Sequence, residues 1–144
     1  MIRFLVVFLI FLSNPLSAFS DTLAGPVQAE VLRVVDGDTV KVRATIWVDQ
    51  TVEVSVRLRG IDAPEIYRPK CDAEKALART AKASVAAVDP VGSQVTISDI
   101  SRDKYGGRVV ATVKTSDGET LSERLLAQGQ AIPMGAPKPW CGVS

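Results

Sequence analysis

Residues 40–48 read Val-Lys-Val-Arg-Ala-Thr-Ile-Trp-Val, in which apolar side chains alternate with mostly polar ones. Side chains two residues apart lie on the same face of a β-strand, so the pattern predicts a strand with one buried face. The side chains expected inside are Val40, Val42, Ala44, Ile46 and Val48. This alternation favours an antiparallel sheet that is packed on one face and solvated on the other.

The segments on either side extend this strand into a three-stranded meander. Asp49-Gln50 is a turn signal, and the residues expected inside the following strand are Val52, Val54, Val56 and Leu58. Residues 27–35 are rich in Val and predict a strand before the turn Asp36-Gly37-Asp38. We therefore expect three consecutive antiparallel strands joined by short turns.

The rest of the chain predicts two helices and two more strands. A helix over 72–88 has Asp72 as its cap and a stripe of small and apolar residues, and Asp89-Pro90 ends it. Strands over 94–100 and 108–115 follow, and a helix over 119–128 ends before Gly129. Five strands with a helix between the third and the fourth match an OB-fold. We predict a mostly β, α+β fold: a five-stranded OB-fold barrel with two helices.

The first twenty residues have the features of a secretory signal peptide. Arg3 gives a positive start, Phe4 to Leu12 is an unbroken apolar run, and Ala18-Phe19-Ser20 offers small residues where a signal peptidase reads. A membrane anchor is the alternative, but the run is too short to cross roughly 30 Å of hydrocarbon. We expect cleavage before Asp21, with cleavage after Ala24 as the alternative. We also expect export to the periplasm or the medium, with no membrane attachment of the mature chain.

The expected mature chain, residues 21–144, has the length of one domain, with a core over about 27–132 and a tail over 133–144. The chain has 17 basic residues including Arg3, so the mature part balances 16 basic against 16 acidic residues. Proteins that bind nucleic acid through bulk charge usually have a basic excess. Any attraction to nucleic acid should therefore come from local clusters of basic residues. Separately, we expect the protein to be a monomer.

Cys71 and Cys141 are the two cysteines of the chain, and both lie in the expected mature part. An even count in an oxidising compartment favours a disulfide. Two independent free thiols are the alternative. The sequence does not favour a zinc site, because two cysteines without any histidine cannot fill four coordination positions.

Acidic side chains gather at the predicted strand ends. Asp36 and Asp38 flank a glycine, and Asp62 and Glu65 follow the third strand, in which Arg57 lies on the polar face. Carboxylates are hard ligands that suit Ca²⁺ or Mg²⁺, and an arginine beside them can hold a phosphate through two parallel hydrogen bonds. An aspartate beside glycine is often only a turn former. The combination nevertheless indicates phosphodiester hydrolysis.

Three segments resemble the staphylococcal-nuclease-like, or thermonuclease, family. They are Asp36-Gly37-Asp38-Thr39-Val40, then Val56 to Glu65, and then Asp103-Lys104-Tyr105-Gly106-Gly107-Arg108. The resemblance covers roughly residues 27–132, and the three segments in this order are specific together. It implies an OB-fold enzyme that uses Ca²⁺ to hydrolyse DNA and RNA with little sequence preference, leaving 3′-phosphates.

The resemblance also implies a metal site. Asp38 and Asp62 match the family's Ca²⁺ carboxylates, and Ala63 matches the residue whose backbone carbonyl is a ligand. Asp36 matches a nearby acid that supports the metal through water. These residues are the expected cation ligands and their support.

Matching positions imply the catalytic and substrate-binding residues. Glu65 matches the carboxylate that orients or deprotonates the attacking water, and Arg57 and Arg108 match the pair that grips the phosphate. Lys104 and Tyr105 match residues beside the terminal phosphate of a bound nucleotide. All of these positions have the residue type that the family's chemistry needs.

Two departures from the family pattern stand out. The third segment has an extra Gly107 before Arg108, which glycine can absorb. The family's best-known member has a third helix where residues 133–144 are rich in Pro and Gly. The alternatives are an inactive nucleic-acid-binding OB module of the same fold and a metal-stabilised structural domain of an envelope complex.

Overall fold

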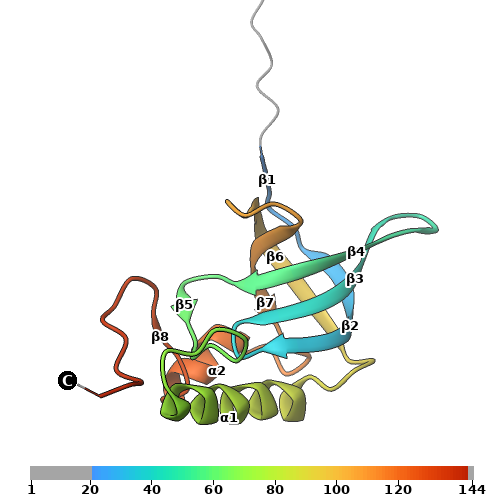
Figure 1. Cartoon of the computed structure of the whole chain (residues 1–144). Coiled ribbons are helices and arrows are strands. Elements are labelled where there is room, and N and C mark those ends of the chain that lie inside the picture. Colours follow the sequence, from blue (N-terminus) through green and yellow to red (C-terminus); the bar gives the residue numbers. More distant parts are fainter. Residues whose placement is uncertain (1–20, 143–144) are drawn as a thin grey trace, which may run out of the picture.

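The computed structural model describes residues 21–142, which form a closed barrel with two helices and a long tail (Figure 1). The barrel strands are β2 (Val27–Asp36), β3 (Thr39–Trp47), β4 (Gln50–Leu58), β6 (Gln94–Arg102) and β7 (Arg108–Lys114). A short strand, β1 (Thr22–Leu23), is added to the sheet beside β6. The predicted signal peptide, residues 1–20, lies outside the described residues.

The barrel closes through one parallel strand pair. β2, β3 and β4 form the predicted antiparallel meander, and β6 pairs antiparallel with both β2 and β7. β7 then runs parallel to β4, so that Arg57 lies opposite Val110 and Ser55 opposite Arg108. The predicted fold class, a mostly β five-stranded OB-like barrel with two helices, is confirmed.

The core lies inside the barrel and under the longer helix. Its fully buried members include Val40, Val42, Val56 and Leu58, as the alternation predicts. The same alternation is wrong at the far end of the hairpin, where Ile46 and Val48 are 54% and 78% exposed. Val52 is exposed there too. The tip of the β3–β4 hairpin projects beyond the barrel, so neither of its faces meets a second layer (Figure 1).

Two helices cover one side of the barrel (Figure 1). α1 (Asp72–Val88) packs against β2 through the buried Ala78, Ala81 and Val85. The predicted stripe is confirmed at Ala81 and Val85 but is wrong at Ala76, Leu77 and Thr80, which are exposed. Its cap is Cys71 rather than the expected Asp72, because the Cys71 sulfur accepts a hydrogen bond from the Glu74 amide. α2 (Leu121–Ala127) begins at a capping box, in which Thr120 and Glu123 satisfy each other's backbone amides.

Residues from the predicted irregular regions form one more strand pair. β5 (Ile61–Asp62) and β8 (Ile132–Pro133) pair antiparallel, and the Met134 amide donates to the carbonyl of Gly60. This pairing brings the start of the tail beside Asp62. Within the described residues, no helix has the length and apolar character needed to span a membrane.

Candidate active site

The β2–β3 turn places two acids side by side. Asp36 ends β2, and its Oδ1 accepts a hydrogen bond from the Asp38 amide at 3.1 Å. Asp38 is only 5% exposed, and its Oδ1 accepts from the Thr39 hydroxyl at 2.9 Å. The turn is therefore fixed by its own carboxylates, and the Asp38 side chain is held in a buried position.

Gly37, between these acids, is a packing residue. A Cβ atom added there would lie 2.7 Å from the Ala81 Cβ on α1 and 3.1 Å from the Ala63 Cβ. The first distance is shorter than real Cβ contacts and the second is tighter than most of them, so α1 lies this close to the turn because residue 37 has no side chain. The acids and the helix are thus in direct contact through this glycine.

Arg57 joins the two predicted metal carboxylates. The β3–β4 register places it opposite Thr39, next to Asp38. Its Nη1 lies 2.8 Å from Asp38 Oδ2 and its Nη2 lies 2.5 Å from Asp62 Oδ1. The same Nη2 donates to the carbonyl of Ile61. The structure therefore brings Asp38 from the β2–β3 turn together with Arg57 and Asp62, which lie about 20 residues later in the sequence.

Backbone amides also hold both of these aspartates. Ala63 donates its amide to Asp38 Oδ2 at 3.2 Å. Gly135 in the tail donates to Asp62 Oδ2 at 3.3 Å. The amide of Gly135 could not be found from the sequence, because any residue except proline carries this donor.

Negative charge is in excess around this cluster. Burial, and then the neighbouring charge of Asp38, raise the pKa of Asp36 to about 7. Burial and Asp38 also raise the pKa of the half-buried Glu65, although Lys138 and Arg57 oppose the shift. Each carboxylate disfavours ionisation of its neighbours, and a bound cation would relieve this repulsion.

The donor chemistry fits a hard cation. The side chains here offer carboxylate oxygens and no imidazole or thiolate, which suits Ca²⁺ and Mg²⁺. Between residues 21 and 142, however, no three acidic, histidine or cysteine side chains are grouped closely enough to hold a metal. Arg57 instead takes one oxygen from each of Asp38 and Asp62.

The predicted second arginine lies on the neighbouring strand. Arg108 begins β7 opposite Ser55, two residues along β4 from Arg57. Its guanidinium pairs with the buried Asp103. Burial alone would raise the pKa of Asp103, but the hydrogen bond and positive charge of Arg108 lower this pKa below its usual value. In the described structure Arg108 thus contacts Asp103, not the carboxylates around Arg57.

The exposed Lys104 and Tyr105 form a cluster with the partly buried Arg108. The Lys104 ammonium lies 4.8 Å and the Arg108 guanidinium 5.7 Å from the centre of the Tyr105 ring, which is 73% exposed. The turn between them contains Gly106 and Gly107, both with positive φ. The inserted glycine therefore takes a conformation that few other residues adopt, and it keeps Arg108 at the start of β7.

Arg59, from the same segment as Arg57, has a structural role. Its guanidinium donates to the carbonyls of Asp99 and Val110 and to the Ser101 hydroxyl. It thus links β4 to both β6 and β7.

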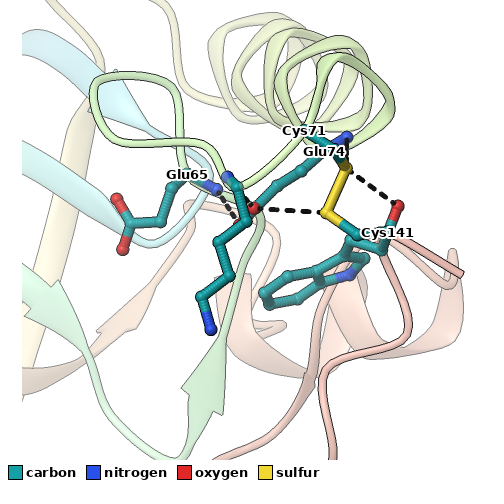
Figure 2. The surroundings of a disulfide bond; sticks show 6 residues. Glu65, Cys71, Glu74 and Cys141 are labelled. Carbon is teal, nitrogen blue, oxygen red and sulfur yellow. Dashed lines mark hydrogen bonds between the residues drawn. A yellow bond between two sulfur atoms is a disulfide. The ribbon is translucent and has the colours of Figure 1, made fainter. Parts of the chain in front are cut away.

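Cys71 and Cys141 form the expected disulfide, across a sequence separation of 70 residues (Figure 2). The bond attaches the tail to the start of α1. It also places the buried Trp140 beside α1, with Lys138 5.4 Å from the centre of the Trp140 ring. The tail thus contacts the site at Gly135 and is tied to the start of α1 by the disulfide.

Comparison with known proteins assigns the family. The profile described as staphylococcal nuclease homologue matches residues 55–138, which include Arg57, Asp62, Glu65 and Arg108 but not Asp38. Proteins named "Uncharacterized endonuclease" from Escherichia coli and from Escherichia coli O157:H7 are each 33% identical over 109 residues, or 76% of this chain. The chain spans 62% of their length. It belongs to the staphylococcal nuclease homologue family.

Proposed function

We propose that this protein is an exported, calcium-dependent nuclease, with residues 21–144 as one mature domain after removal of residues 1–20. The observation that carries the proposal is Arg57, which bridges Asp38 and Asp62 beside the half-buried Glu65. Membership of the nuclease family supports it. The disulfide supports export, because such bonds persist in oxidising compartments.

The proposed reaction is hydrolysis of phosphodiester bonds in DNA and RNA with little sequence preference, leaving 3′-phosphates. Asp38, Asp62 and the Ala63 carbonyl would hold Ca²⁺, and Asp36 would support it through water. When bound, the cation supplies Lewis-acid stabilisation of charge on the phosphoryl oxygen. A monomer is sufficient, because all of these residues lie in one chain.

The protein's own groups would position the substrate and move the proton. Glu65 would accept the proton of the attacking water, for which its raised pKa makes it a better base than an exposed carboxylate. Arg57 would exchange its carboxylate partners for phosphate oxygens, which its planar guanidinium can bind in pairs. Its charge would then stabilise the additional negative charge of the transition state.

The cluster of Lys104, Tyr105 and Arg108 at the β6–β7 turn would bind the substrate at one side. Lys104 and Arg108 are cations that both lie close to an exposed aromatic ring, and Tyr105 can stack on a base or sugar. This local positive charge supplies the attraction that the neutral overall charge lacks.

Chelation provides the first test. The exported protein should cut labelled single- and double-stranded DNA and RNA with Ca²⁺, and excess EDTA should abolish cutting, because the carboxylates then lack their cation. End-group analysis should find 3′-phosphates. Full activity in EDTA would refute the metal dependence. Binding of nucleic acid without cutting, under every divalent metal, would favour the inactive OB module. The observation behind this alternative is that Arg57 pairs with Asp38 and Asp62, the two carboxylates that would otherwise bind the metal.

A second test concerns the second arginine. Arg108→Lys keeps a positive charge beside the buried Asp103 but removes the guanidinium that can donate two parallel hydrogen bonds to a phosphate. The fold should therefore persist while the rate of hydrolysis falls by about 10²-fold. Arg102→Ala is the matched control, because Arg102 is largely exposed and pairs with Asp21 at the sheet edge. The rate is measured with Ca²⁺ at saturating DNA. A normal rate for Arg108→Lys, with a low rate for Arg102→Ala, would transfer the role to Arg102.

A further inference from the structure

The segment that carries Glu65 has no regular structure of its own. It runs from Ala63 to Cys71, between β5 and α1, without helix or strand. Backbone amides in such a segment need partners from elsewhere, since an unpaired buried amide is costly. What holds this loop determines where the Glu65 carboxylate lies.

A second glutamate holds the loop at two points. Glu74 is only 3% exposed, and its Oε1 accepts the amide of Glu65 at 3.2 Å. Its Oε2 accepts the amide of Lys70 at 2.7 Å. One buried carboxylate therefore ties together both ends of the segment 65–70. Figure 2 shows the Glu65 side chain extending to the other side, away from Glu74 and the disulfide.

Glu74 is itself held rigidly. It lies in the first turn of α1, where the helix dipole favours a negative charge, and its own amide donates to the Cys71 sulfur at 3.4 Å. The Cys141 sulfur lies 3.8 Å from Glu74 Oε2. A disulfide sulfur has no hydrogen to donate, so this is a packing contact that covers the carboxylate.

We propose that Glu74 is a positioning residue for the hydrolytic reaction: its carboxylate fixes the Glu65 backbone and thereby the position of the Glu65 carboxylate. This inference rests on the proposed function of Glu65. Glu74 acts through the main chain and does not touch the substrate. The sequence places it in a helix N-terminal turn, where an acid is ordinarily explained by the helix dipole.

Removing this carboxylate should affect the turnover rate. Glu74→Ala should lower kcat by about 10- to 100-fold with little change in KM, because a displacement of about 1 Å at a catalytic group can cost about 10²-fold. Glu74→Gln keeps one acceptor and should give a smaller loss. In a Glu65→Gln background, Glu74→Ala should cause almost no further loss.

The matched control is Asp89→Asn. Asp89 is a buried acid at the opposite end of α1, 2% exposed, where its amide donates to the Val85 carbonyl. Asp89→Asn should leave kcat unchanged even if it shifts the melting temperature. If Asp89→Asn lowers kcat as much as Glu74→Ala does, or if the losses from Glu65→Gln and Glu74→Ala simply multiply, the positioning role is overturned.

Amide hydrogen exchange separates this inference from the proposed function. The Glu65 and Lys70 amides should be protected in the wild type and exposed in Glu74→Ala, whether or not the protein cuts nucleic acid. Unprotected wild-type amides would overturn the tie. If the wild-type amides are protected but Glu65→Gln is fully active, Glu65 has no catalytic role. The positioning role of Glu74 is then overturned as well. A slow Glu65→Gln with a normal Glu74→Ala would overturn the inference alone.

Discussion

Replacing Arg57 with alanine should lower the rate of phosphodiester hydrolysis by on the order of 10³-fold or more, the cost typical of removing a transition-state donor. Arg57 is the cation that lies between Asp38 and Asp62, at 2.8 and 2.5 Å. Single-turnover cleavage of labelled DNA at saturating Ca²⁺ would measure the loss directly. A rate within tenfold of the wild type would contradict the proposed role.

Arg43→Ala is the control for that experiment. Arg43 also lies between two carboxylates, those of Glu30 and Glu53 at 3.5 and 3.0 Å, but its side chain is 42% exposed on the outer face of the sheet. It should leave the rate unchanged, since an exposed ion pair contributes little. Arg57→Ala also leaves the buried Asp38 and the half-buried Asp62 without their cationic partner, so Ca²⁺ should raise its melting temperature more than that of the wild type.

Removing the disulfide should lower the melting temperature by on the order of 10 °C. In the chain-entropy model, a loop of roughly 70 residues contributes up to about 4 kcal/mol, and each kcal/mol shifts the melting temperature of a domain of this size by several degrees. Thermal unfolding of Cys71→Ser/Cys141→Ser, compared with the oxidised protein, measures the change. The serine at position 71 can still cap α1.

The same double variant should keep nearly the wild-type rate at low temperature. The hydrogen bonds of Glu74 to the loop amides do not involve the sulfurs, so the Glu65 position should survive in the folded protein. Intact mass and thiol titration of the exported wild type provide the control. Two free thiols, or an unchanged melting temperature in the variant, would contradict the stabilising role.

Much of the fold could be predicted because alternation and turn chemistry are local. The α1 bounds follow from its stripe and from Asp89-Pro90, and the strands agree within a few residues. Alternation does not reveal how far a strand runs past its packing partner, so Ile46 and Val48 were assigned to the core wrongly. The parallel pairing of β7 with β4 also depends on the closed barrel as a whole.

The candidate site likewise contains residues that local sequence patterns indicate and residues that they do not. Asp38, Arg57 and Asp62 were predictable as a group, because each lies at a strand end or opposite one in a short-turn meander. Glu74 and Gly135 were not, since a buried helix glutamate and a loop amide carry no distinctive signal. The family resemblance predicts that Arg108 binds the phosphate, but no sequence pattern indicates that Asp103 is its partner in the structure.

The close contact between Gly37 and Ala81 makes these two positions dependent on each other, although they are 44 residues apart in the sequence. A side chain at 37 would overlap with Ala81. A substitution at 37 is therefore accessible only together with a smaller residue at 81 or with a shift of α1 away from the turn. Such a shift would also carry Glu74 with the helix. Variation in this part of the protein should accordingly be correlated, so that the acidic turn and α1 change together.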